Sequence, residues 1–255
     1  MVNNANDILF RPSSLGDLMS GTGKGWSVAN SLTCKKKLIK IFREIKHNRY
    51  YNFSNKYTEK GIKMEEDAIT LYSRFKKQYF KKNSVRLQNE LFTGEFDVDC
   101  KTHTVDIKCS WSLDTFPHPA VDKVSDGYFY QGYGYMDLTG YKKHIVAYCL
   151  VNAPANLILL EKEALYYKMN CPDETNEKYI QAKIDIEKNM IFDMEQFKSD
   201  NPHFDIDCKE WIYDIPLNER VVEFEINYDE NEAQAIKDRL IECRNWMNIN
   251  LFKTT

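Results

Sequence analysis

The sequence lacks the cysteine and histidine patterns that mark disulfide-stabilised and zinc-binding proteins. Its seven cysteines are odd in number and scattered, and none form a Cys-x-x-Cys pair, so neither a disulfide framework nor a zinc site is expected. His103, His118, His144 and His203 are isolated from one another, which argues against a zinc hydrolase. No apolar run reaches membrane-spanning length, and no secretory leader is recognisable. A reducing, cytoplasmic setting is therefore expected.

The chain also lacks internal repeats, low-complexity tracts and linkers rich in proline, glycine or serine. Only 7 prolines and 10 glycines occur among 255 residues, and 43% of the residues are hydrophobic against 29% charged. This is the composition of a globular protein with a substantial core. We therefore expect one domain over residues 1–255, with a basic helical part at 1–60, a core carrying the candidate chemistry at 61–151, and a helical and strand–helix part at 152–255.

Charge is distributed unevenly along the chain, although the net charge is only −3. From Lys24 to Arg86 there are 17 Lys or Arg against 5 Asp or Glu, whereas residues 87–255 carry 17 against 31. A concentrated basic segment is typical of a phosphate-binding surface. The first basic run, which includes Lys35, Lys36 and Lys37, therefore predicts a phosphate-binding helix. A helix face that is merely solvated is the plain alternative.

Four aromatic residues follow this basic run, namely Tyr50, Tyr51, Phe53 and Tyr57. Exposed rings beside a basic surface are suited to stacking on nucleic-acid bases. Packing in the core is the alternative, and the sequence leaves both open.

Two neighbouring strands are predicted between residues 95 and 111. Glu95, Asp97 and Asp99 alternate with apolar residues in the first strand, and Asp106 and Lys108 do so in the second. Because successive strand side chains point to opposite faces, Asp97, Asp106 and Lys108 are expected to converge on one face of the sheet. Two carboxylates with a lysine suit a divalent-metal site for phosphodiester hydrolysis. The plain alternative is a hairpin whose solvent face carries acids and a lysine.

A helix is predicted from Gly61 to Lys82, because apolar residues recur there at helical spacing. On an ideal helix Glu65 lies at the rim of the apolar stripe and Glu66 lies on the opposite side. Glu65 is therefore expected to reach a metal at the sheet, whereas Glu66 is expected to face water. The alternative for Glu65 is an ordinary first-turn acid favoured by the helix dipole.

Another helix is predicted from about Ser125 to Leu138. Within it Gln131 and Tyr135 are four residues apart and share one face. Gly132 and Gly134 are poor helix formers, so their presence indicates close packing or a backbone near a ligand.

The remaining segments alternate between helices and strands, which predicts an α/β fold with a central mixed sheet flanked by helices. The expected elements are a basic helix at 27–50 capped by Ser31 or Thr33, a helix stop at Gly140, a buried strand at His144–Val151, charged helices at 157–199 broken near Asn170–Asp173, a strand at Val221–Ile226, and a helix from Glu230 onward.

Taken in order, these motifs resemble one family. Gly61-x-x-x-Glu65-x-x-Ala68, Gly94-x-x-Asp97, Asp106-x-Lys108 and Gln131-x-x-x-Tyr135 resemble the PD-(D/E)xK nucleases, specifically the RecB-like and phage lambda exonuclease-like (YqaJ-type) branch. The opening Arg11-Pro12-Ser13-Ser14-Leu15-Gly16-Asp17-Leu18-Met19 also resembles the start of phage recombination exonucleases. Gly94-Glu95-Phe96-Asp97 departs from the Ser-Pro-Asp-Gly of lambda-like members and is closer to the RecB-like form.

The resemblance implies a restriction-endonuclease-like core and a DNA nuclease that depends on one or two Mg²⁺ or Mn²⁺ ions. It implies that Asp97, Asp106, Glu65 and the carbonyl of Ile107 bind metal, and that Lys108 is catalytic. It further implies that Gln131 and Tyr135 act with Glu65 in catalysis, and that Arg11 and Ser14 hold a phosphate. No iron–sulfur cluster is expected, because the cysteine spacing gives no support for one.

The activity implied is that of an exonuclease that processes DNA ends in phage-type recombination or repair. The setting would be the cytoplasm of a bacterial or phage-infected cell, with a single-strand-annealing or recombination protein as partner. Two alternatives stay open. One is an endonuclease of the same fold, of restriction or junction-resolving type. The other is a non-catalytic DNA-binding protein on the nuclease fold.

Overall fold

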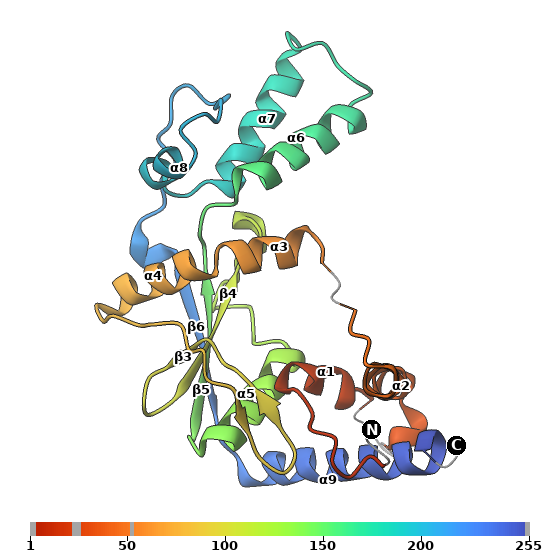
Figure 1. Cartoon of the computed structure of the whole chain (residues 1–255). Helices are drawn as coiled ribbons and strands as arrows, with labels where there is room; N and C mark the ends of the chain where they lie inside the picture. Colours follow the sequence, from red (N-terminus) through yellow and green to blue (C-terminus); the bar gives the residue numbers. More distant parts are fainter. Residues whose placement is uncertain (1–3, 22–26, 52–53, 253–255) are drawn as a thin grey trace.

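A four-stranded mixed sheet stands at the centre of the molecule, in the strand order β3-β4-β5-β6 (Figure 1). The computed structural model describes residues 4–21, 27–51 and 54–252, so Lys24 and Phe53 lie outside the described residues. The strands of this sheet are β3 (Val98–Asp99), β4 (Thr104–Cys109), β5 (Lys143–Cys149) and β6 (Val221–Asn227). Two further strands, β1 (Leu87–Gln88) and β2 (Thr93–Gly94), pair with each other in a separate two-stranded sheet.

Helices cover both faces of this sheet, as the sequence predicts for an α/β fold. The α-helices are α1 (Leu15–Leu18), α2 (Leu32–His47), α3 (Lys56–Lys63), α4 (Glu65–Lys76), α5 (Asp126–Thr139), α6 (Ala155–Lys168), α7 (Glu177–Met190), α8 (Met194–Asp200) and α9 (Glu230–Met247). The shorter helical turns are η1 (Pro12–Ser14), η2 (Val28–Asn30), η3 (Leu113–Thr115), η4 (Leu217–Glu219) and η5 (Asn248–Phe252). The predicted central mixed sheet flanked by helices is confirmed.

The register of the sheet decides which side chains share a face. β3 pairs antiparallel with β4, β4 pairs parallel with β5, and β5 pairs antiparallel with β6. Val98 lies opposite Val105, so Asp97, the residue before β3, falls beside Asp106, and its side chain accepts from the backbone N–H of Ile107. Directly opposite residues of an antiparallel pair point to the same face. The register of β3 and β4 and this hydrogen bond together place the two acids close to each other.

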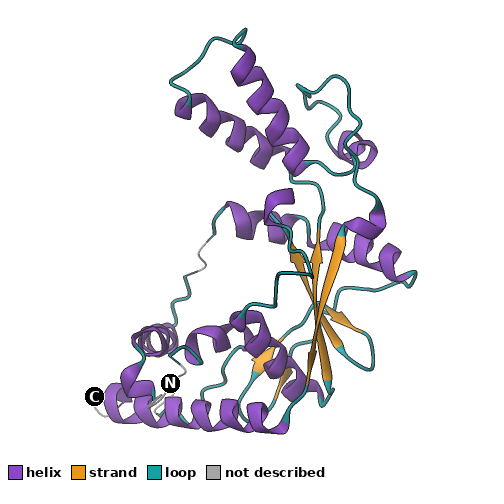
Figure 2. Cartoon of the chain, turned by 180° about the vertical axis from the view of Figure 1, so that it is seen from behind, coloured by secondary structure: helices purple, strands orange, loops and turns teal. Residues whose placement is uncertain are grey.

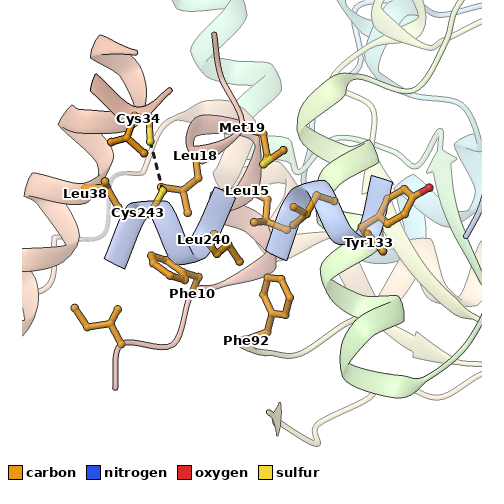
Figure 3. Close-up of a cluster of buried hydrophobic side chains, with 14 of the residues drawn as sticks. Phe10, Leu15, Leu18, Met19, Cys34, Leu38, Phe92, Tyr133, Leu240 and Cys243 are labelled. Atoms are coloured by element: carbon orange, nitrogen blue, oxygen red, sulfur yellow. Dashed lines mark hydrogen bonds between the residues drawn. The ribbon is translucent and has the colours of Figure 1, made fainter. Parts of the chain in front are cut away.

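Apolar side chains fill the space on each side of the sheet. Val105 and Ile107 of β4 pack with Ala68 and Tyr72 of α4 on one face. On the other face α5 packs on β5, and beyond α5 lie α1, α2 and α9. Figure 3 shows this second cluster, where the Sγ atoms of Cys34 and Cys243 lie 3.7 Å apart.

The predicted single helix from Gly61 to Lys82 is wrong, because two helices occupy this region. Asn55 caps α3, and the backbone leaves the helical conformation at Met64, with φ −102° and ψ 10°. A second helix, α4, then starts at Glu65 and ends at Lys76, where Lys77 adopts a left-handed φ of 53°. The apolar stripe continues across the break, so periodicity alone did not reveal it. Glu65 therefore stands in the first turn of α4.

Other local predictions are confirmed by capping geometry. The side chain of Ser31 caps α2 by accepting from the backbone N–H of Cys34 at 3.2 Å. Ser125 caps α5, and Gly140 ends α5 with a φ of 76°. The charged region at 157–199 forms α6, α7 and α8, and Figures 1 and 2 show α6 and α7 side by side, projecting away from the sheet. Among the described helices, none is both long and apolar enough to cross a membrane.

Two glycines of α5 allow it to approach its neighbours closely. A Cβ atom at Gly132 would lie 2.6 Å from Cδ2 of His144 in β5, and one at Gly134 would lie 2.9 Å from Cβ of Pro12. Real Cβ atoms do not come this close to neighbours in a packed interior. The close packing predicted for Gly132 and Gly134 is thus confirmed.

Gly132→Ala should destabilise the protein by about 1–3 kcal/mol, because the added methyl overpacks the contact with His144. Gly127→Ala in the same helix is the matched control. A Cβ there meets only Ser125 Oγ, at 3.9 Å, so this change should stabilise by about 0.4–1 kcal/mol. Thermal unfolding of both variants measures the difference. Equal midpoints would show that α5 is free to shift.

Candidate active site

A cleft of about 1420 Å³ opens where the end of β4 faces α5, α3 and α2. Most of the residues predicted to form a site line this one cleft, although they come from distant parts of the chain. They are Arg11, Ser14, Lys37, Glu65, Asp97, Asp106, Ile107, Lys108, Gln131 and Tyr135. Lys35 and Lys36 are not among its lining residues.

Asp97 and Asp106 form the acidic centre of the cleft. The Asp97 carboxylate accepts a 2.6 Å hydrogen bond from the backbone N–H of Ile107, which fixes it against β4. Asp106 is only 3% exposed. Burial, and then the negative charge of Asp106, raise the pKa of Asp97 well above its ordinary value. Two carboxylates held this way repel each other, so the pair is suited to a cation.

Lys108 supplies positive charge beside this pair. Its ammonium forms an ion pair with Oδ2 of Asp106, and its Nζ lies 4.6 Å from the centre of the Tyr128 ring. Burial alone lowers the pKa of Lys108, but the adjacent Asp106 carboxylate outweighs burial and raises the pKa above its ordinary value. Lys108 is therefore a fixed cation near neutral pH.

Glu65 reaches the cleft but is held by another partner. Its Oε2 accepts from Nζ of Lys82 at 2.5 Å, and this contact is what chiefly raises the pKa of Lys82. Glu66 is exposed to solvent, as the helix phase predicts, and does not line the cleft. Lys82 was missed by the sequence analysis, because it lies in the segment after α4 and no local pattern links it to Glu65.

The oxygen atoms at this centre fit a hard divalent cation. Carboxylate and carbonyl oxygens are the donors that Mg²⁺ and Mn²⁺ prefer. Asp97 and Asp106 supply the carboxylates, and Ile107 lines the same cleft. Within the described ranges, no three His, Cys, Asp or Glu side chains form a metal-binding group, so Glu65 does not complete one here.

Gln131 and Tyr135 lie on the face of α5 that closes the cleft. Both are buried, and Nε2 of Gln131 donates to the hydroxyl of Tyr135 at 3.1 Å. Burial, and then the charge of Asp106, raise the pKa of Tyr135, so its phenol stays neutral and can donate a hydrogen bond. The two side chains, four residues apart on one helix face, are thus in direct contact.

The turn η1, which packs on α5, brings Arg11 and Ser14 to the lining of the cleft. Arg11 is exposed, Ser14 is buried, and Pro12 between them packs on Gly134. A guanidinium and a hydroxyl on one turn are chemically suited to a phosphate.

The three predicted lysines of α2 have separate surroundings. Lys35 donates to the carbonyl of Ala29 at 2.8 Å, and Lys37 pairs with Asp17 at 3.1 Å. Lys36 instead lines a groove of about 880 Å³ along α2, together with Lys40, Arg43, His47 and Arg49. Lys40, Glu44 and Tyr51 line both the groove and the cleft, so the two hollows are continuous.

Solved structures similar to this chain are exonucleases. A phage-related exonuclease from Haemophilus somnus 129PT matches with a TM-score of 0.68 and 23% identity over 99% of both chains. The alkaline exonuclease LHK-Exo from Laribacter hongkongensis matches with a TM-score of 0.51 and 11% identity, over 98% of this chain and 97% of that one. LHK-Exo in complex with dAMP gives a TM-score of 0.50 and 12% identity, over 98% and 96%. These likenesses establish the shared fold. No protein-family model and no curated protein matches the sequence.

In metal-free solution, Asp97→Asn should raise the melting temperature by several degrees at pH 9. The raised pKa means that the folded state holds the Asp97 proton more tightly than the unfolded chain does. Wild-type stability should therefore fall as the pH rises above about 4, and the advantage of Asp97→Asn should grow over the same range. About 1 kcal/mol corresponds to roughly 2–4 °C for a chain of this size.

Scanning calorimetry in EDTA from pH 5 to pH 9 measures this effect. The matched control is Asp99→Asn in the same hairpin, because Asp99 accepts from Lys101 at 2.7 Å and from Tyr141 at 3.1 Å. This control should lower the melting temperature. An equal loss in both variants would mean that Asp97 and Asp106 do not repel each other.

Proposed function

We propose that the protein is a metal-dependent DNA nuclease of the PD-(D/E)xK type, which acts on DNA ends as an exonuclease. One observation carries the proposal: Asp97, Asp106 and Lys108 meet on adjacent strands in the same cleft as Gln131 and Tyr135. The fold shared with exonucleases supports it. End processing in phage-type recombination or repair, with a single-strand-annealing or recombination protein as partner, is the role that we propose with it.

Asp97, Asp106 and the carbonyl of Ile107 are the groups that we propose to hold one or two Mg²⁺ or Mn²⁺ ions. Glu65 would join as a further or water-mediated ligand once it leaves Lys82. When bound, such an ion lowers the pKa of a coordinated water and draws electron density from a phosphoryl oxygen. The mutual repulsion of the two buried carboxylates supports this assignment, because a cation would relieve it.

The remaining residues act directly on the scissile phosphate. Lys108 carries a permanent positive charge and stabilises the extra negative charge that develops on the phosphorus oxygens in the transition state. Gln131 donates to the Tyr135 hydroxyl oxygen, which leaves the Tyr135 O–H free to donate to a non-bridging phosphate oxygen. Arg11 and Ser14 bind a neighbouring phosphate and fix the register of the strand.

End-labelled linear DNA and covalently closed circular DNA, each incubated with Mg²⁺ or Mn²⁺, test the proposal. We expect the linear DNA to be degraded from its ends and the circle to be spared. Cleavage of the circle would favour the endonuclease alternative. Binding without cleavage of either DNA would favour the non-catalytic alternative and contradict the proposal.

Lys108→Met tests the mechanism in the same assay. It should lower kcat by about 10²–10³-fold with little change in DNA affinity, because a positioned cation acts chiefly on the transition state. Lys101→Met is the matched control, since Lys101 lies in the same hairpin with its side chain 83% exposed. A Lys108 variant that cleaves within a few-fold of wild type would exclude a catalytic lysine at this position.

Charge reversal of Lys36, Lys40 and Arg43 should weaken DNA binding at all sequences and flatten its salt dependence. Each lost phosphate contact reduces the slope of log K against log salt by about 0.9 on duplex DNA, or about 0.7 on single strands. The slope is measured by titration at several salt concentrations. Reversal of the exposed lysines Lys168, Lys178 and Lys198 is the control. An unchanged slope in the first variant would move the DNA path to another face.

A further inference from the structure

An aromatic pair stands on the wall of the cleft beyond the acidic centre. Tyr57 of α3 and Trp111, which follows β4, pack edge to face with ring centres 5.1 Å apart and planes at 73°. Nζ of Lys56 lies 5.3 Å from the Tyr57 ring centre and 5.1 Å from that of Trp111. Both rings line the same cleft as Asp97 and Asp106.

Contacts from several elements hold this pair in place. Asn55 caps α3 by accepting from the backbone N–H of Tyr57 at 3.0 Å. Lys60, which is fully buried, donates to the carbonyl oxygen of Trp111 at 2.9 Å. Lys56 is anchored to Glu161 of α6 at 2.7 Å. The rings are therefore positioned by the protein before any ligand arrives, which reduces the entropy lost on binding.

Core packing accounts for part of the Trp111 surface but leaves the Tyr57 ring open to solvent. Tyr57 is 55% exposed, and Tyr50 and Tyr51, which also line the cleft, are 58% and 72% exposed. Each Å² of aromatic surface left in water gives up about 25 cal/mol of the stabilising free energy that burial would provide. Such a concentration of exposed rings inside one cleft marks a ligand-binding surface.

We propose that the Tyr57 ring, held edge to face by Trp111, is a platform on which an unpaired DNA base stacks while its backbone passes Asp97 and Asp106. This inference rests on the proposed nuclease function. Flat ring faces beside a cation suit a neutral base attached to an anionic backbone. Arg11, Lys37 and Lys40 on the same cleft complement the phosphates.

The platform requires the DNA end to be unpaired. Bases within a duplex stack on one another and present only their edges to a protein. Trp111 follows Lys108 by three residues, which spans at most about 11 Å of chain. A stacked base would then lie within about three nucleotides of the phosphate at Lys108. Since every base has a ring face, the platform would be indifferent to sequence.

A scan with abasic residues tests the platform. The Asp106→Asn protein, which should bind without cleaving, is titrated with short blunt duplexes that carry one tetrahydrofuran abasic residue at successive terminal positions of either strand. We expect affinity to fall about five- to 150-fold at one position, because a base stacked on an aromatic ring contributes about 1–3 kcal/mol. Adding Tyr57→Leu should remove this penalty, whereas adding Tyr79→Leu should preserve it, since Tyr79 is 84% exposed and lies outside the cleft.

The outcomes separate the platform from the nuclease itself. A flat scan, or a penalty that persists with Tyr57→Leu, would overturn the platform even if wild-type protein degrades linear DNA. Trp111→Phe, which keeps a ring at this half-buried position, should retain the penalty and shows that the effect does not come from misfolding. If wild-type protein neither binds nor cleaves DNA, the platform and the proposed function both fall.

Discussion

The close approach of α5 to its neighbours is the constraint on which the cleft depends. Gly132 lets the helix lie against His144 of β5, and Gly134 lets the turn at Pro12 lie against the helix. One helix thereby fixes the distance between the sheet, which carries Asp106, and the turn beside Arg11 and Ser14. A side chain at either glycine would separate these walls. The glycines act through spacing, and the chemistry belongs to the residues that they bring together.

The electrostatics of the cleft oppose folding. Asp97 and Asp106 are buried side by side, and the Ile107 N–H and the Lys108 ammonium offset part of their charge. Glu65, which lines the same cleft, forms an ion pair with Lys82. Repulsion between two buried carboxylates costs free energy in the folded state, so part of the stability gained in the apolar core is lost here.

Local patterns predicted most of the fold, and tertiary contacts explain the rest. Strand alternation predicted the convergence of Asp97 and Asp106, and the caps at Ser31, Ser125 and Gly140 follow from local geometry. The break between α3 and α4 at Met64 was not predicted, because the apolar stripe continues through it. β3 is shorter than its alternation suggests because the Asp97 side chain takes the N–H of Ile107. Likewise, the charge pattern predicted a basic helix, but it could not predict that Lys35 bonds to the carbonyl of Ala29 whereas Lys36 lines the groove.

The attachment of the N-terminal segment to α9 has a consequence for biosynthesis. Arg239 of α9 donates to the carbonyl of Leu18 at 3.0 Å, and Arg244 donates to that of Ile8 at 2.7 Å. Arg11 lies between these anchor points, yet α9 is translated after every strand of the sheet. During translation the segment from Ile8 to Leu18 is synthesised early, but its hydrogen bonds to Arg239 and Arg244 can form only after α9 has been made. The segment that carries Arg11 therefore reaches its folded position only after α9 has been synthesised.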